Sequence, residues 1–131
     1  VAYSFKARFA DLVMAGTKRQ TIRAPRKSAH AKAGSPLTFY TGPRMKPLLI
    51  GASKCTEVLN VELDLEANAV TTWAPDKPEP PSANINTTRA LHDFATADGF
   101  ENWSDMRDWF LETHDAPIFR GLIIRWGALS A

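Results

Sequence analysis

The chain changes abruptly from a helical to an extended pattern near its N-terminal end. Phe9, Leu12 and Val13 recur at helical spacing, and Gly16 follows as a residue that readily ends a helix in the left-handed conformation. Residues 20–23 then alternate as a strand does. A helix that stops on glycine and runs at once into a strand leaves the connection little freedom. We therefore expect this junction to hold one defined position in the fold.

Cationic side chains crowd this junction. Lys18, Arg19 and Arg23 flank the hydroxyl of Thr21. In a strand Thr21 and Arg23 share one face, and Lys18 precedes the strict alternation, so it can reach the same side. Like charges placed together repel one another, which favours an anionic partner or altered ionisation. The alternative interpretation is a solvated basic turn.

The length and composition are those of a single domain covering residues 1–131, since 44% of the residues are apolar and 23% are charged. No apolar run approaches the ~20 residues of a membrane span, and we recognise no secretory signal. We therefore expect a protein without membrane association.

Cysteine and histidine are too sparse to suggest a metal centre. Cys55 is the only cysteine, which excludes an intramolecular disulfide and fits a cytoplasmic protein. His30, His92 and His114 are scattered, whereas a zinc site needs ligands at tight spacing. The sequence predicts neither a metal site nor a cofactor, and it leaves the oligomeric state open.

The charge is divided between the two parts of the chain. Residues 1–54 contain 11 Lys and Arg against one acid, a net charge of +10, whereas residues 55–131 contain 5 against 13, a net charge of −8. A positive face attracts polyanions, of which nucleic acid is the leading candidate. The acidic part argues against general coating of nucleic acid and favours a localised basic groove.

Short strand patterns recur at regular spacing, which in a chain of this size favours a barrel or a strongly curved sheet. A different, helical period follows Thr88, with a stripe of Leu91, Phe94 and Ala95 that ends at Asp98 and Gly99. We expect an α+β fold with a small β-barrel, one early helix and two helices inserted before the last strand. The predicted strands are residues 2–5, 20–23, 36–40, 48–50, 54–63, 69–73 and 119–126.

The last predicted helix has a recognisable start. Ser104 is a good N-cap, and Asp105 lies in the first turn, where the helix dipole favours an acid. Met106, Trp109 and Phe110 follow at the spacing of one helix face.

Residues 74–87 form a proline-rich loop, which we expect to be a mobile surface connection dispensable for folding, although a proline-recognition ligand is a further possibility. Its prolines are Pro75, Pro78, Pro80 and Pro81.

Together these segments resemble the ASCH domain, a branch of the PUA-like superfamily. The resemblance is carried by residues 16–23, by Gly34 with 37–40, by 41–46, by 91–100 and by the terminal 119–126. It implies a β-barrel with flanking helices and a cleft between them, and association with RNA. It also implies a hydrolase, because deacylation of N4-acetylcytidine and cleavage of single-stranded RNA both occur in the family.

The resemblance implies three catalytic residues. In the deacylase branch a Lys, a Thr and a Glu act together, and Lys18 and Thr21 match the first two, while Asp98 stands at the third position with one methylene less. An attacking Thr21 hydroxyl needs a base, and a lysine serves best with a pKa of ~7–8 rather than its usual ~10.4. Arg19 and Arg23 would lower that pKa, and a close Asp98 would raise it. Asp98 also stands at a predicted helix C-terminus, where the dipole disfavours a carboxylate.

Five further residues suit nucleotide binding, with guanidinium and ammonium groups toward phosphate and a ring toward a base. They are Arg19, Arg23, Tyr40, Arg44 and Lys46. Trp126 we place in the core instead.

Two classes of function follow: a hydrolase acting on RNA or a modified nucleoside, and an RNA-binding module without catalysis. A buried contact among carboxylate, lysine and threonine would favour the hydrolase. An open basic groove would favour the binding module. A protein-interaction domain that uses the proline loop is a third, weaker interpretation.

Overall fold

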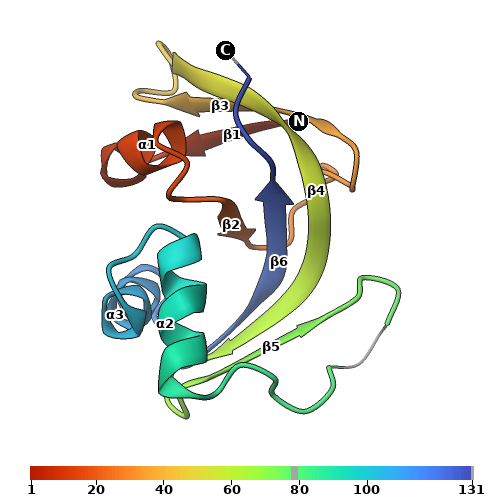
Figure 1. Ribbon diagram of the computed structural model, residues 1–131, viewed down its shortest axis with the longest axis vertical. Helices are drawn as coiled ribbons and strands as arrows, with labels where there is room; N and C mark the ends of the chain where they lie inside the picture. Colours follow the sequence, from red (N-terminus) through yellow and green to blue (C-terminus); the bar gives the residue numbers. More distant parts are fainter. Residues whose placement is uncertain (78–79, 131) are drawn as a thin grey trace.

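The computed structural model describes residues 1–77 and 80–130. Within these ranges six strands form one mixed sheet and three helices lie beside it, which confirms the predicted α+β class (Figure 1). The strand order is β1-β3-β4-β6-β2, and β5 pairs with β4 off this path. The elements in chain order are β1 (Ala2–Phe5), α1 (Ala7–Met14), β2 (Gln20–Arg23), β3 (Pro36–Thr41), β4 (Leu48–Asp64), β5 (Ala69–Trp73), α2 (Thr88–Ala97), α3 (Trp103–His114) and β6 (Ile118–Trp126).

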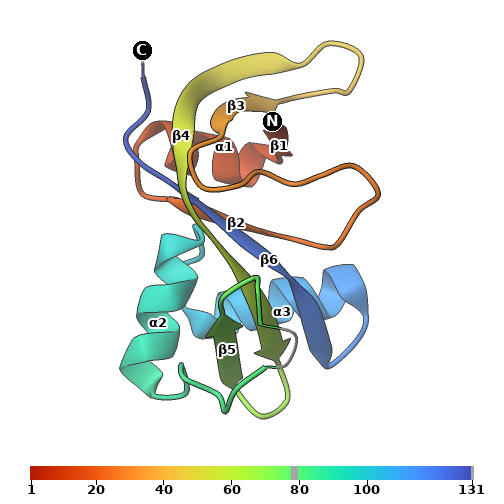
Figure 2. The same cartoon turned by 90° about the vertical axis from the view of Figure 1, so that its right-hand side faces the viewer.

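The long strand β4 holds the two ends of the sheet together. Its first part pairs with β3, and its second part pairs with β6 on one side and β5 on the other (Figure 2). A register shift between Cys55 and Glu57 marks the crossover, and a bulge of this kind bends a strand. The two strands predicted at 48–50 and 54–63 are therefore one continuous strand, because the bend does not interrupt it.

The predicted barrel is not confirmed, because the sheet does not close. Among the described residues, β1 pairs with β3 and β2 pairs with β6, but β1 and β2 do not pair with each other. A side chain spans this opening instead: the Arg23 guanidinium donates a hydrogen bond to the Ser4 carbonyl at 2.8 Å. The opening between β1 and β2 leaves room for a pocket that residues of both strands line.

Local signals place the ends of α1 and α2 as predicted. Gly16 has φ +80°, and the Thr17 and Lys18 amides both donate to the Leu12 carbonyl at 3.0 Å. Gly99, with φ +92°, follows the end of α2. Glycine accepts these left-handed conformations without the steric cost that a Cβ would bring.

The start of α3 differs from the prediction. Its N-cap is Asn102 and not Ser104, since the Asn102 side chain accepts a hydrogen bond from the Asp105 amide at 2.8 Å. Asn is as good a cap as Ser, and the position with the reachable amide decides between them. The Asp105 carboxylate lies in the first turn, as expected.

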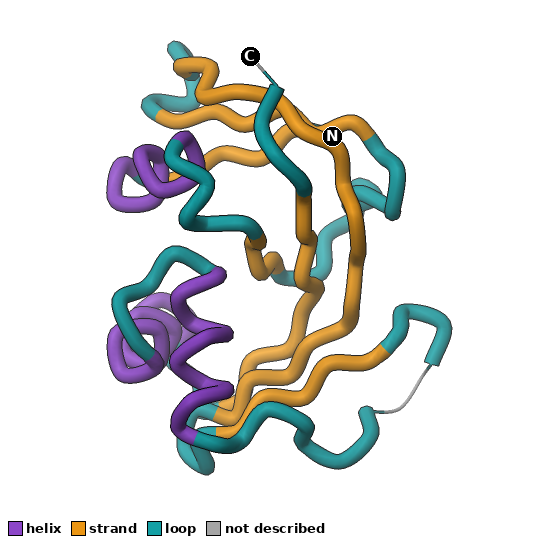
Figure 3. The backbone as a smooth tube through the Cα atoms, in the orientation of Figure 1, coloured by secondary structure: helices purple, strands orange, loops and turns teal. Residues whose placement is uncertain are grey.

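The helices lie on the concave side of the sheet, with α1 toward one end and α2 and α3 toward the other (Figure 3). Aromatic side chains fill much of the space between these groups, including Phe9, Phe100, Trp109 and Phe110. Trp126 is buried against Phe5 and Phe39, which confirms its place in the core.

The predicted proline loop is not free along its whole length. The Asn84 side chain accepts from the Thr72 amide and donates to the Thr72 carbonyl, at 3.2 and 3.0 Å. Ile85 forms a bridge with Val70 in β5. The end of this loop therefore continues the sheet as a single bridge, which corrects the prediction of a wholly mobile connection. Pro78, one of the prolines that motivated that prediction, lies outside the described residues.

In the described part of the chain, no helix is both long and apolar enough to span a membrane.

Candidate active site

The pocket that contains the candidate residues occupies the opening between β1 and β2 and extends to α3. Its volume is about 240 Å³. One side is polar and contains the candidates Lys18, Thr21, Arg23 and Asp98, and the other side is largely aromatic. The walls comprise Ser4, Phe5, Lys6, Phe9, Lys18, Thr21, Ile22, Arg23, Ala24, Asp98, Phe100, Trp109, Phe110, Thr113, His114 and Phe119.

Lys18 is a buried cation at the base of the polar side. It is 3% exposed, and its Nζ donates to the Asp98 carbonyl oxygen at 2.5 Å and lies 3.6 Å from Asp98 Oδ1. The Phe9 and Phe5 rings lie 5.0 and 5.7 Å from the amine. The backbone amide of Lys18 is held at the end of α1 by its bond to the Leu12 carbonyl, and the side chain extends from there to the end of α2.

Asp98 caps α2 at the helix end that disfavours a carboxylate. Its side chain is 4% exposed, and the Lys18 amine approaches both its carboxyl and its backbone carbonyl. The carbonyl groups at a helix C-terminus carry partial negative charge, and a cation there offsets the charge of the acid. The predicted convergence of Lys18 and Asp98, 80 residues apart in the sequence, is confirmed by this contact.

Thr21 shares the pocket with them. It is 4% exposed, and its Oγ1 accepts a hydrogen bond from Arg23 Nε at 3.0 Å. The same guanidinium reaches the Ser4 carbonyl and lies over the Tyr3 and Phe5 rings. Arg23 is thus a fixed donor that faces the Thr21 oxygen, with its charge beside the pocket.

The ionisation of the buried pair departs from that of exposed groups. Burial lowers the pKa of Lys18; Asp98 opposes this change, and Arg23 contributes to it. Burial raises the pKa of Asp98, against the opposing effect of Lys18. Both directions favour uncharged groups, because the two side chains are buried. Lys18 can therefore act as a base at a lower pH than an exposed lysine.

The aromatic side of the pocket was not predicted. The Phe110 and His114 rings stack at 5.5 Å with an angle of 22°, and Phe119 lies 4.5 Å from His114. Burial lowers the pKa of His114, which favours a neutral imidazole. The only available sequence signal was the i, i+4 spacing of Phe110 and His114 on α3, which also occurs in ordinary core helices.

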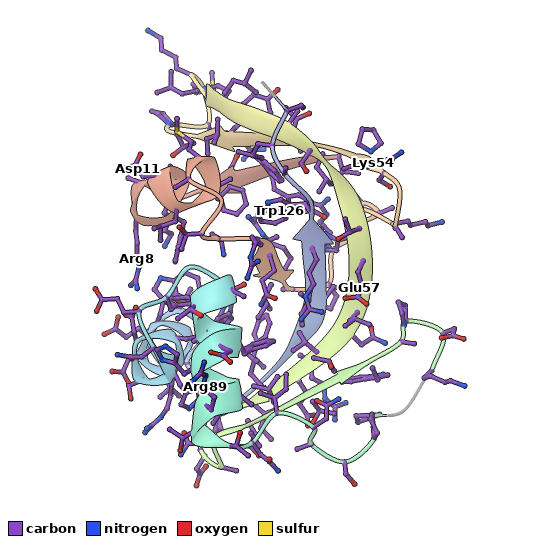
Figure 4. The ribbon with its side chains drawn as sticks, in the orientation of Figure 1. Arg8, Asp11, Lys54, Glu57, Arg89 and Trp126 are labelled. Carbon is purple, nitrogen blue, oxygen red and sulfur yellow. The ribbon has the colours of Figure 1, made fainter. Side chains whose placement is uncertain are left out.

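An ion pair joins α1 to α3 beside this side of the pocket. Arg8 extends from α1 toward α3, where its guanidinium contacts the Asp105 carboxylate (Figure 4). The guanidinium also lies 5.2 Å from the Phe9 ring and 5.0 Å from the Phe100 ring. This contact connects the two helix groups that flank the pocket, and sequence analysis did not identify it.

Four of the five predicted nucleotide-binding residues lie outside the pocket. Arg19 is exposed, and Tyr40 is half-buried on β3. Arg44 and Lys46 are exposed in the β3–β4 turn, at the opposite end of the molecule from α2 and α3 (Figure 1). Arg23 alone of the five lines the pocket. The expected single basic groove is therefore divided into a buried pocket and a separate exposed basic turn.

No family model, no curated protein and no solved structure matches this chain.

Proposed function

We propose that this chain is a cytoplasmic ASCH-type domain of PUA-like fold that hydrolyses an acyl amide on a modified nucleoside, as an N4-acetylcytidine amidohydrolase does. The observation that carries the proposal is the buried contact of Lys18 with Asp98 in the pocket that also contains Thr21. A buried lysine with a lowered pKa that lines the same pocket as a hydroxyl is a pattern of nucleophilic catalysis. The curved sheet with helices on its concave side is compatible with an open form of the PUA-like barrel.

Lys18, Thr21 and Asp98 each have a separate role in the proposed reaction. Lys18 Nζ takes the proton of the Thr21 hydroxyl as Oγ1 attacks the carbonyl carbon of the amide. The C–N bond then breaks, and the nitrogen leaves with the proton that Lys18 took up. Water, deprotonated by Lys18, attacks the carbonyl carbon of the Thr21 ester; the C–Oγ1 bond breaks, the carboxylic acid leaves, and Lys18 returns the proton to Thr21 Oγ1. Asp98 accepts hydrogen bonds from the protonated amine and limits its charge in the pocket.

Arg23 supports the attacking oxygen. Its Nε donates to Thr21 Oγ1, so a guanidinium charge faces the atom that loses its proton. A cation fixed beside Oγ1 stabilises the negative charge that this oxygen acquires as Lys18 removes its proton. The burial of Arg23 also lowers its own pKa, although the value for arginine is too high for it to lose its charge near neutral pH.

The pocket favours a compact, flat ligand over a polymer. A volume of about 240 Å³ is suited to one small molecule, and the half-buried Trp109 ring and the exposed His114 ring in its wall offer stacking surfaces for a base. Arg44 and Lys46, which would contact the phosphates of a longer strand, do not line the pocket. An amidohydrolase acting on a nucleoside is therefore the hydrolase that the geometry supports best, ahead of a ribonuclease.

An activity screen tests the proposal. The purified chain is incubated with N4-acetylcytidine, other acylated cytidines and single-stranded RNA, and the products are separated by chromatography. We expect turnover of an acylated nucleoside, with Lys18→Met and Thr21→Ala each lowering kcat by about 10²–10⁴-fold. Arg44→Ala is the matched control and should leave nucleoside turnover unchanged. Absence of turnover on every acylated cytidine, or full activity of Thr21→Ala, would refute the catalytic proposal.

The exposed basic residues keep a second function open, that of an RNA-binding module. Residues 1–54 carry a net charge of +10, and Arg19, Arg44 and Lys46 are exposed. Binding to single-stranded RNA would then weaken with salt, with a slope of about −0.7 for each phosphate contacted. A fluorescence titration at several salt concentrations measures that slope. Salt-dependent binding that Arg44→Ala weakens, without any turnover, would favour this module over the hydrolase.

A further inference from the structure

A chain of hydrogen bonds connects the Asp98 carboxyl to the protein surface through Gln20. Gln20 is 1% exposed, and its Nε2 donates to Asp98 Oδ1 at 3.4 Å. Its Oε1 accepts from Arg125 Nε at 3.2 Å, and Arg125 Nη1 donates to Glu57 Oε1 at 2.7 Å. The Arg125 and Glu57 side chains are 34% and 49% exposed. The buried acid of the site is thus linked to an ion pair at the surface.

The sheet register produces this arrangement. Gln20 in β2 is the direct partner of Arg125 in β6, and Arg125 is the partner of Glu57 in β4. Glu57 lies midway along β4, just after the register shift (Figure 4). Three neighbouring strands therefore place an amide, a guanidinium and a carboxylate side by side.

Arg125 decides which way the Gln20 amide points. A guanidinium has donors only, so the Gln20 oxygen must face it and the NH₂ group must face Asp98. With the amide held in this orientation, Asp98 Oδ1 receives a donor and can act only as an acceptor there. A free amide could rotate and present its oxygen to Asp98, which would favour a protonated carboxyl.

We infer that Gln20, oriented by Arg125 and Glu57, is a positioning residue that holds Asp98 Oδ1 as a hydrogen-bond acceptor directed at the Lys18 amine. This arrangement opposes the effect of burial, which favours the protonated acid. The catalytic consequence rests on the proposed function, because a fixed acceptor steadies the protonated Lys18 that forms in each step. The orientation of the carboxyl itself does not depend on that function.

Charged groups on other elements also act on this pair. Lys18 and Arg23 favour the charged form of Asp98, while Arg23 and Arg8 favour the neutral form of Lys18. Gln20 differs from these groups because it is neutral and acts through the direction of one hydrogen bond. A 3.4 Å contact is long, as is common in resting sites, and we expect it to shorten when Lys18 is protonated.

The first test removes the group that orients the amide. In Arg125→Met we expect the side-chain NH₂ resonances of Gln20 to shift and the NMR titration midpoint of the Asp98 carboxyl carbon to rise. Arg120→Met is the matched control, because Arg120 also lies on β6 and pairs with a β4 carboxylate, that of Glu62, at 2.7 Å. It should leave both signals at their wild-type values. A folded Arg125→Met protein with unchanged Gln20 and Asp98 signals overturns the inference.

The second test replaces the donor itself. Gln20→Glu keeps the size of the side chain and a partner for Arg125 but presents a carboxyl oxygen to Asp98, so the Asp98 midpoint should again rise. If the proposed function is correct, kcat should fall about tenfold while KM stays within about twofold. If the wild type shows no turnover and the Asp98 midpoint still rises in Gln20→Glu, the positioning role is supported and the hydrolase is refuted. Unchanged kcat and an unchanged midpoint would overturn the positioning role while the hydrolase stands.

Discussion

Gly99 offers a sharp test of the buried geometry around Lys18. A Cβ added at Gly99 would lie 3.0 Å from Lys18 Cδ and 3.3 Å from Lys18 Cβ and Cγ, in a backbone conformation with φ +92°. Gly34 has nearly the same conformation, φ +91°, but nothing within 4 Å of the added atom. Gly34→Ala should therefore show the backbone cost alone, about 1–2 kcal/mol. Gly99→Ala should lose the same amount and, from crowding of the buried stem, about 1–3 kcal/mol more.

Urea denaturation of the two variants and the wild type measures this difference. The Lys18 amine is anchored on the Asp98 carbonyl and its stem is buried, so the side chain has little room to move aside. If the hydrolase proposal holds, the folded Gly99→Ala protein should also turn over more slowly than folded Gly34→Ala. Equal losses of stability in the two variants would show that the Lys18 stem yields freely, and the argument from its fixed position would fail.

Two further predictions concern Asp98 and the proline loop. Because the folded pKa of Asp98 lies above the usual 3.8, the folded state holds a proton that the unfolded chain has released. The stability of the wild type minus that of Asp98→Asn should therefore fall as the pH rises from 3.8 to the folded pKa. Urea denaturation of the wild type and of Asp98→Asn at several pH values checks this, and a difference in stability that rises with pH would contradict it. Asn84→Ala should lower the stability measured by thermal unfolding by about 1 kcal/mol, because it removes the two hydrogen bonds to the Thr72 backbone. Asn86→Ala, the control, should lower it by less than about 0.5 kcal/mol. Equal losses would show that the Asn84 bonds do not hold the end of the loop in place.

Local sequence was sufficient to predict the three helices and the ends of α1 and α2, but it misplaced the start of α3. The stripe of Leu91, Phe94 and Ala95 is buried as its period predicts, and Gly16 and Gly99 end their helices in left-handed conformations. These features depend on residues within one or two turns of each other, so the sequence contains the whole cause. Three candidate site residues, Lys18, Thr21 and Asp98, were found together with the help of a family resemblance, and their catalytic role stays a prediction.

The tertiary structure decided the features that depend on pairing between distant segments. No periodicity shows that β1 and β2 stay apart and that Arg23 spans the opening, because closure depends on the bend in β4. Strand register brings Gln20 to Arg125, 105 residues away, which no local pattern encodes. For the same reason the sequence could identify Arg44 as a basic turn residue but could not show that it lies outside the pocket. Short-range periodicity specifies which side of an element is buried, and only the packing of whole elements specifies which side chains meet there.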